Sequence, residues 1–280
     1  MVRMTRVALI GVLMVSTAAC QQQAAAPANE EAGTAEVAGT EPFNGTWKAD
    51  LASVKLDEKP SVYLLKDGTY TCSTCTPPLT LAADGAFHPV ADRPYYDSAS
   101  RTVVDENTVK AAYRKDGKVT SESTSVVSPD GKTLTINWRE TPVGQPEVKG
   151  TTIETRVGPA PDGAHAISGS WKIAKFEGIS DEVLTVTFNA SGDSMSMTSP
   201  AGQSYTAKFG GPEVPIAGDT GGTTVKVERL SANSFRETSM RGGKVVNVTT
   251  ATVGADGKMN VVSENKQQGS TMQYSAIKQS

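Results

Sequence analysis

Three cysteines and two histidines are the side chains with the most specific chemistry in this sequence of 280 residues. Cys72 and Cys75 form a Cys-x-x-Cys pattern, and His88 follows thirteen residues after the second cysteine. Such a pattern can form a local disulfide, supply two metal ligands or exchange electrons with other thiols. A structural zinc site needs four ligands, and only His88 is an obvious third. A thioredoxin-like site would begin a helix, whereas Pro77-Pro78 and the strand-like residues around it argue against a helix here.

The motifs of the common hydrolases and nucleotide-binding enzymes are missing from the sequence. Gly-x-Ser-x-Gly, His-Glu-x-x-His, the phosphate loop and the dinucleotide fingerprint do not occur. Ser275 and Lys278 match Ser-x-x-Lys, but residues three apart on a strand face opposite sides of the sheet. The second histidine, His165, lies beside Gly163 in a segment rich in turn-forming residues. We therefore predict a protein that is not an enzyme and needs no cofactor.

The N-terminus has the organisation of a secretory signal peptide. Arg3 and Arg6 precede the apolar run 7–15, which is too short to span a membrane, and small residues then lead to Cys20. Small residues followed by a cysteine resemble the lipobox of bacterial lipoproteins, in which the thiol is acylated and the signal is removed. Gln21, rather than Asp, at the next position implies delivery to the outer membrane. The alternative is ordinary cleavage that leaves a free thiol at Cys20.

The residues after Cys20 predict a flexible tether and an acidic exported protein. Residues 21–42 include no aromatic residue and are dominated by Gln, Ala, Glu, Gly and Thr, so we expect them to be disordered. Loss of residues 1–19, with Arg3 and Arg6, changes 27 basic residues to 25 against 30 acidic ones, a net charge of about −5. This balance, without basic clusters, makes nucleic acid an unfavourable partner.

The predicted compartment also bears on the Cys-x-x-Cys pattern. In an oxidising periplasm neighbouring thiols pair, so we predict a disulfide between Cys72 and Cys75. A metal site with His88 and a redox role remain the alternatives.

An internal repeat divides the rest of the chain. A first landmark recurs at an offset of 124 residues and three others recur at an offset of 126. The four pairs are Phe43–Lys48 with Ile167–Lys172, Pro89–Ala91 with Pro215–Ala217, Gly117–Val119 with Gly243–Val245, and Asp130–Lys132 with Asp256–Lys258. We predict a signal peptide at 1–19, a lipidated tether at 20–42, a first barrel at 43–157, a linker at 158–166 and a second barrel at 167–280.

Both repeats read as antiparallel β-structure. Alternating or β-branched runs are separated by Asp-Gly or Gly-Gly pairs, which supply the positive φ angles of tight hairpins. The predicted strands cover 108–114, 118–127 and 132–139 in the first repeat and 234–241, 244–253 and 258–264 in the second. A meander avoids exposed edges by closing on itself. The expected class is all-β, with two tandem up-and-down antiparallel meander barrels of about seven to nine strands each.

The ends of each repeat resemble those of the lipocalin and fatty-acid-binding-protein group of barrels, the calycin-like fold. In that group a Gly-x-Trp begins the first strand, the Trp closes the base of the barrel, and a cation from the last strand lies over it. A cation over an indole ring contributes about 0.5 to 2 kcal/mol. The residues that carry the resemblance are Gly45, Trp47 and Arg156 in the first repeat, and Gly169, Trp171 and Lys278 in the second. It implies that Trp47 pairs with Arg156 and that Trp171 pairs with Lys278.

The interior of these barrels is expected to be small or partly polar. Aromatic residues make up 6% of the chain, and neither face of 118–127 is cleanly apolar. Fatty ligands need pockets lined mainly by apolar groups, so a fatty acid is not the first expectation.

One loop of the first repeat has the composition of a binding surface. Arg93, Tyr95 and Tyr96 are residue types that dominate binding hot spots, and the second repeat has glycines and small polar residues in the same place. Alternatively, the two tyrosines cap a core that is poor in aromatic residues.

The sequence as a whole is similar to bacterial lipoproteins of unassigned function with two such domains. We expect a lipid-anchored outer-membrane protein that faces the periplasm and binds a small molecule or an envelope component. The rival hypothesis is a hydrolytic or metal-handling envelope protein that uses Cys72, Cys75 and His88.

Replacement of Cys20 by Ser tests the predicted anchor. The serine hydroxyl is not acylated by the lipoprotein pathway, so we expect the variant to move from the membrane fraction to the soluble fraction. Cell fractionation followed by immunoblotting measures this. A C20S variant that still sediments with membranes would contradict the lipobox interpretation.

Overall fold

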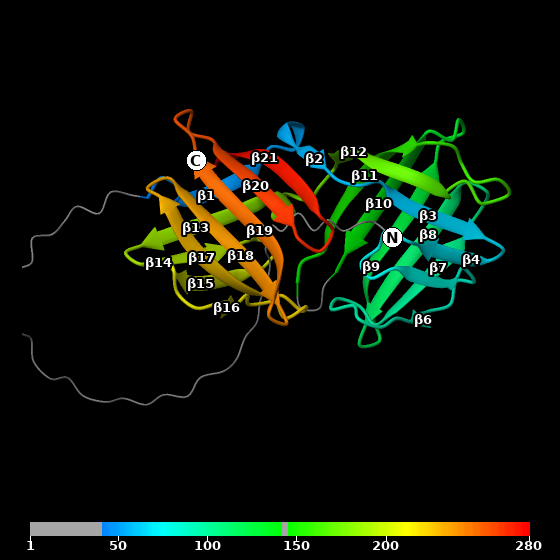
Figure 1. The fold of residues 1–280 in the computed structure, drawn as a ribbon, viewed down its shortest axis with the longest axis horizontal. Helices are drawn as coiled ribbons and strands as arrows, with labels where there is room; N and C mark the ends of the chain where they lie inside the picture. The colour runs from blue at the N-terminus through cyan, green and yellow to red at the C-terminus, as the bar shows by residue number, and fades with distance from the viewer. Residues whose placement is uncertain (1–40, 142–144) are drawn as a thin grey trace, which may run out of the picture.

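The computed structural model describes residues 41–141 and 145–280, which form two antiparallel β-barrels side by side (Figure 1). The all-β class and the two-barrel architecture are thus confirmed. The predicted signal peptide, Cys20 and nearly all of the tether lie outside the described residues.

Each barrel is one continuous sheet. The strands of the first barrel are β3 (Ser61–Lys66), β4 (Thr69–Cys72), β5 (Leu79–Ala82), β6 (His88–Pro89), β7 (Ser98–Val103), β8 (Thr108–Lys115), β9 (Lys118–Val127), β10 (Thr133–Glu140), β11 (Val148–Val157) and β12 (Gly169–Glu177). Those of the second barrel are β1 (Gly45–Ala49), β2 (Lys55–Asp57), β13 (Thr185–Ser191), β14 (Ser194–Thr198), β15 (Ser204–Lys208), β16 (Val214–Pro215), β17 (Thr224–Ser231), β18 (Ser234–Arg241), β19 (Lys244–Val253), β20 (Met259–Asn265) and β21 (Ser270–Lys278). A 3-10 turn, η1 (Leu51–Ser53), connects β1 to β2 within the second barrel, and a short helix, α1 (Asp181–Leu184), connects β12 of the first barrel to β13 of the second.

The hairpins form where the turn residues predict them. Asp116 and Gly117 have φ values of 51° and 77° between β8 and β9, and Gly242 and Gly243 have φ values of 54° and 73° between β18 and β19. Both central residues of a type I′ turn need positive φ, which Asp and Gly tolerate best. The predicted strand boundaries in this half of each repeat agree with the structure to within one residue.

Each sheet has more than the expected seven to nine strands. The additional strands are short segments without an alternating sequence pattern. The two-residue strands β6 and β16 stand at the ends of their sheets, and each contains a proline, Pro89 or Pro215. Proline has no N–H to donate, so it is suited to an edge position. Isolated bridges, Asp84 to Thr102 in the first barrel and Phe209 to Val227 in the second, bring the sheet ends together and nearly close both barrels.

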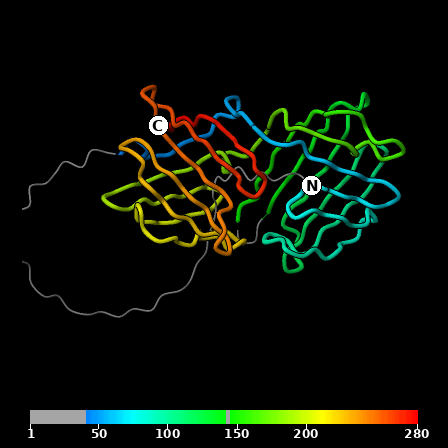
Figure 2. Tube along the Cα trace, viewed as in Figure 1, coloured from blue at the N-terminus to red at the C-terminus, as the bar shows by residue number. Residues whose placement is uncertain are grey.

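The first strands of the two repeats are exchanged. Strand β1 pairs with β13 and β21 in the second barrel, and β12 pairs with β11 and β3 in the first. Figures 1 and 2 show the blue N-terminal segment among the strands of the C-terminal barrel before the chain crosses to the other one. The expectation that residues 43–157 and 167–280 each build their own barrel is therefore wrong for β1 and β12. The short linker after β11 lets β12 pair with its neighbour in sequence. Strand β1 takes the corresponding place beside the last strand of the second barrel, β21.

Each barrel has its own hydrophobic core, which includes the exchanged strand. Trp47 of β1 lies in the core of the second barrel and Trp171 of β12 in that of the first, with exposed fractions of 1% and 0%. The exchanged strands therefore supply the largest buried side chain of each barrel.

The exchange predicts which fragments fold. Residues 43–157 lack β12 and retain β1 without its partners, so we expect no cooperative unfolding transition. Residues 58–180 have nearly the same length and contain every strand of the first barrel, so we expect β-type circular dichroism and a cooperative melt. Thermal melts of the two fragments make the comparison. Equal, cooperative melts would show that the exchange is not needed for folding.

Candidate functional site

The Gly-x-Trp motifs meet the predicted cations at the base of each barrel, but with the partners exchanged. Lys278 Nζ lies 5.4 Å from the centre of the Trp47 ring, and Arg156 Cζ lies 4.1 Å from that of Trp171. The resemblance had implied pairs within each repeat, Trp47 with Arg156 and Trp171 with Lys278, and this assignment is wrong because β1 and β12 change barrels. The type of interaction is as expected.

The glycine of each motif gives the cation room to cross the strand. A Cβ at Gly45 would lie 2.6 Å from Cε of Lys278, and one at Gly169 would collide with the guanidinium of Arg156. Both glycines also have positive φ, 117° and 126°. Arg156 donates to the carbonyl groups of Ser168 and Ala166 at 2.6 and 2.7 Å, so it fastens the chain around Trp171. These contacts hold each Gly-x-Trp motif against the last strand of its barrel or the adjoining chain.

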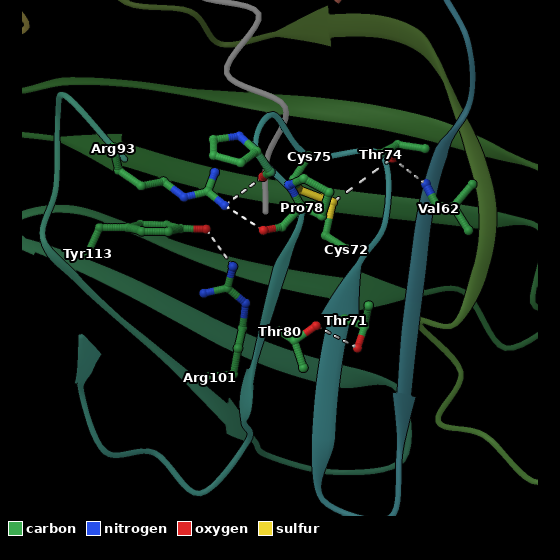
Figure 3. Close-up of a disulfide and its surroundings, with 11 residues drawn as sticks. Val62, Thr71, Cys72, Thr74, Cys75, Pro78, Thr80, Arg93, Arg101 and Tyr113 are labelled. Carbon is green, nitrogen blue, oxygen red and sulfur yellow. Dashed lines mark hydrogen bonds between the residues drawn. A yellow bond between two sulfur atoms is a disulfide. The ribbon is translucent and has the colours of Figure 1, made fainter. Parts of the chain in front are cut away.

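The structure joins Cys72 and Cys75 in a disulfide, which confirms the prediction (Figure 3). Both cysteines are buried in the core of the first barrel. His88 is directed elsewhere, with Nε2 lying 2.8 Å from Oδ1 of Asp84. In residues 41–141 and 145–280, no group of three His, Cys, Asp or Glu side chains could hold a metal ion. The disulfide therefore occupies both sulfur atoms that the metal hypothesis requires.

The three loop residues predicted to bind a ligand make contacts within the protein. Arg93 donates to the carbonyl groups of Pro77 and Pro78, beside the disulfide (Figure 3). The ring of Tyr96 packs against that of Tyr113 with 4.7 Å between the centroids, as the alternative of a core cap implies.

Tyr95, in contrast, reaches the second barrel. Its hydroxyl donates to Oδ1 of Asp219 at 3.0 Å and accepts a hydrogen bond from Arg241. Gly221 lies beneath the ring, where a Cβ would be 2.5 Å from the nearest ring atom. Tyr95 thus joins the two barrels. A ligand role for Arg93, Tyr95 and Tyr96 stays a prediction.

A partly open cavity of about 30 Å³ lies in the second barrel. Its walls are mainly aromatic, aliphatic and thioether groups, with Glu237 and Thr249 as polar members. The lining residues come from six strands and from α1: Trp47, Ala49, Leu184, Val186, Phe188, Phe235, Glu237, Thr249, Ala251, Met259, Val261, Tyr274 and Ala276. Two of these positions, Trp47 and Ala49, belong to the exchanged strand β1, so the cavity exists only when both repeats contribute.

Glu237 is the ionisable group of this cavity. It projects inward from β18 between Val227 of β17 and Thr249 of β19, and it is 6% exposed. Tyr205 of β15 donates a hydrogen bond to Oε1 of Glu237, and it is the only hydrogen-bond partner of this carboxyl group within the described part of the chain. Burial raises the pKa of Glu237 to about 7, although the hydrogen bond from Tyr205 acts in the opposite direction. Burial, and then Glu237, raises the pKa of Tyr205 well above its usual range.

The interior of the first barrel has a different polar group. Arg101 of β7 is 1% exposed and lies over the rings of Tyr70 and Tyr113, at 4.6 and 5.0 Å. It donates to the hydroxyl of Tyr113 at 2.6 Å and to the carbonyl of Ser100 at 2.7 Å. Glu154 of β11 is buried in the same barrel and contributes to the electrostatic environment of Tyr70. This cation therefore has aromatic and hydroxyl neighbours of its own.

Sequence reasoning missed the buried charges of Glu237 and Arg101. Glu237 lies two residues after the buried Phe235, and Arg101 lies two residues after the buried Ala99. Residues two apart on a strand face the same side, so each charge breaks an inward-facing apolar series. This break in the series was the available signal. To recognise it, one must know which face of the strand points into the barrel, and the sequence alone does not show this.

Comparison of the chain with known protein families, with curated proteins and with solved structures finds no match. In the part of the chain that the structure describes, no helix is long and apolar enough to cross a membrane.

The raised pKa of Glu237 predicts how stability depends on pH. The ordinary pKa of Glu is about 4.5, and the folded protein raises that of Glu237 to about 7. Between these two pH values the unfolded chain has lost this proton and the folded protein still holds it. The free energy of unfolding therefore falls as pH rises through this range. The total loss is about 3 kcal/mol, because one pKa unit corresponds to about 1.4 kcal/mol. Glu237→Gln keeps an oxygen that can accept from Tyr205 but cannot ionise. We therefore expect E237Q to be more stable than the wild type at pH 8 and nearly equal to it at pH 4.5.

Denaturant unfolding at the two pH values measures this difference. Glu228→Gln is a matched control, because Glu228 is exposed on the neighbouring strand β17. If E237Q and E228Q changed stability equally at pH 8, the carboxyl of Glu237 would not be the group responsible.

Proposed function

We propose that this protein is a lipid-anchored binding protein of the bacterial cell envelope, without enzymatic activity, whose second barrel holds a small molecule in its interior. In this proposal Cys20 carries the lipid, and the barrels face the periplasm from the outer membrane. The N-terminal pattern and the Cys72–Cys75 disulfide support an exported location, because disulfides persist in oxidising compartments.

The observation that carries the proposal is the cavity beside Glu237. A buried carboxyl group costs several kcal/mol of free energy unless hydrogen bonds or an opposite charge offset the loss of water. Here one tyrosine hydroxyl is the hydrogen-bond partner within the described residues, and the remaining space beside the carboxyl is about 30 Å³. Small-molecule sites combine mostly apolar walls with a few polar groups that fix the orientation of the ligand. The cavity has this composition.

The same composition supports binding rather than catalysis. The described residues that line the cavity include a carboxyl group, a threonine and a tyrosine, but no histidine, cysteine, serine or lysine. Nucleophilic catalysis needs a nucleophile that is hydrogen-bonded to a base. The hydroxyl of Thr249 donates to Ser263 rather than to Glu237. The rival hypothesis of a metal-handling or hydrolytic site at Cys72, Cys75 and His88 has no comparable support, because the two sulfur atoms are joined.

Filling the cavity tests the proposal. Ala276 lines it and is buried, so Ala276→Val places two additional carbon atoms in the space. Ala174→Val is the control, because Ala174 is exposed on β12. Each protein is purified from the envelope, denatured with organic solvent, and the released small molecules are identified by mass spectrometry.

We expect the wild type and A174V to release the same compound in near-stoichiometric amount and A276V to release none. Circular dichroism confirms that A276V is folded. Equal release from all three proteins, or release from none, would contradict binding in this cavity.

A further inference from the structure

We propose that the ligand of the second barrel carries a small ammonium group, and that Glu237 binds this group as a carboxylate inside the cavity. The inference rests on the proposed function and specifies the chemical class of the ligand. It follows from the size of the cavity, the charge of its polar group and a comparison of the two barrels.

Size excludes the larger ligand classes. One water molecule needs a cavity of about 10 to 15 Å³, so about 30 Å³ admits a group of about two heavy atoms, whereas an engineered cavity that accepts benzene measures about 150 Å³. An aromatic ring or an acyl chain would therefore not fit without rearrangement of the core. An ammonium group has nearly the size of a water molecule, so ammonium itself, methylammonium or the end of a primary amine fits.

Charge and wall chemistry favour a cation over a neutral or anionic group. A carboxylate is acceptor-only, so its natural partner in a mainly apolar site is a group with several N–H donors. The rings of Trp47, Phe188 and Phe235 line the same cavity, and aromatic faces attract cations. Two cationic side chains of the barrel interact with groups other than Glu237: Lys278 lies over Trp47, and Arg229 pairs with Glu41 at 2.7 Å. Glu237 forms no ion pair with another described residue.

The first barrel shows that the fold does not need this carboxyl group. At the repeat offset of 126 residues, Glu237 corresponds to Ala111, which is also buried on the equivalent strand. Tyr205 corresponds to Leu79, which is buried as well. A barrel of the same topology thus closes with alanine and leucine at these positions, so the Glu237–Tyr205 pair is an addition to the second barrel.

The elements around Glu237 determine the pH dependence of binding. The titratable groups that face it are Tyr205 on β15 and Tyr274 on β21, and the burial of each raises its pKa above the ordinary value. The neighbours on β17 and β19, Val227 and Thr249, do not titrate. Both tyrosines are therefore neutral near pH 7, and Glu237 is the group that changes charge there. A cation binds the carboxylate, so its affinity falls as pH decreases below about 7.

Methyl NMR of the full chain with labelled methionine provides the test, because the side chain of Met259 lines the cavity. The probe is methylammonium chloride at pH 6, 7 and 8. Methanol is the neutral probe of similar size, potassium chloride controls for ionic strength, and tetramethylammonium chloride controls for size. The variants are E237Q and the exposed-strand control E228Q.

We expect methylammonium to shift the Met259 signal saturably in the wild type and in E228Q, with affinity falling up to tenfold per pH unit below about 7. E237Q should lose at least tenfold in affinity and all of the pH dependence, while its other methionine signals stay in place. Potassium and tetramethylammonium should produce no saturable shift.

Other results would overturn the inference. Saturable binding of methanol but not of methylammonium would remove the ammonium class and leave the small-molecule function intact. Equal binding of methylammonium by E237Q and by the wild type would remove the role of the carboxyl group. Absence of any saturable shift of Met259, together with a wild type that releases no compound in the cavity-filling experiment, would remove both proposals.

Discussion

The pairing of β12 with β11 and β3, and of β1 with β21 and β13, is the constraint on which both barrels depend. Each exchanged strand brings a tryptophan whose indole N–H donates to a carbonyl four residues earlier, Phe43 for Trp47 and Ile167 for Trp171, both at 2.8 Å. Loss of a buried aromatic side chain of this size costs about 3 to 5 kcal/mol. Neither barrel can therefore lose its exchanged strand without losing much of its stability, and the two repeats fold as partners.

The exchange also brings the connections between barrels into the interiors. After β12 the chain crosses through α1, and Leu184 at the end of this helix lines the cavity of the second barrel. After β2 the chain crosses in the other direction, and the buried Glu58 approaches the backbone N–H of Ile173 in the first barrel. Lys48 of β1 and Asp181 of α1 form an ion pair of 2.7 Å. A ligand that moved Leu184 would thus act on a segment that both barrels share.

The two barrels have diverged in the charge that they bury. Arg101 in the first corresponds to Val227 in the second, and Glu237 in the second corresponds to Ala111 in the first. Arg101 is surrounded by tyrosines and shares its barrel with Glu154, whereas Glu237 has a tyrosine and a cavity. A buried charge that is satisfied by protein groups stabilises one arrangement of the core. A buried charge beside a cavity can bind a ligand. In the proposed function, this contrast favours the second barrel as the one that binds the ligand.

Local patterns in the sequence determined the class of fold, the hairpins and the repeat. Asp116-Gly117 and Gly242-Gly243 specify their turns because few residues tolerate positive φ. Only two residues separate Cys72 from Cys75, so a single turn brings their Cα atoms to 5.5 Å, a distance at which a disulfide forms. The partners of β1 and β12 were decided only by the tertiary structure. Both repeats have the same pattern, so pairing within a repeat and pairing between repeats satisfy the same local preferences. For a related reason the sequence does not show that Glu237 points inward. A shift of one residue in strand register turns every side chain to the other face, and only the closed barrel fixes that register.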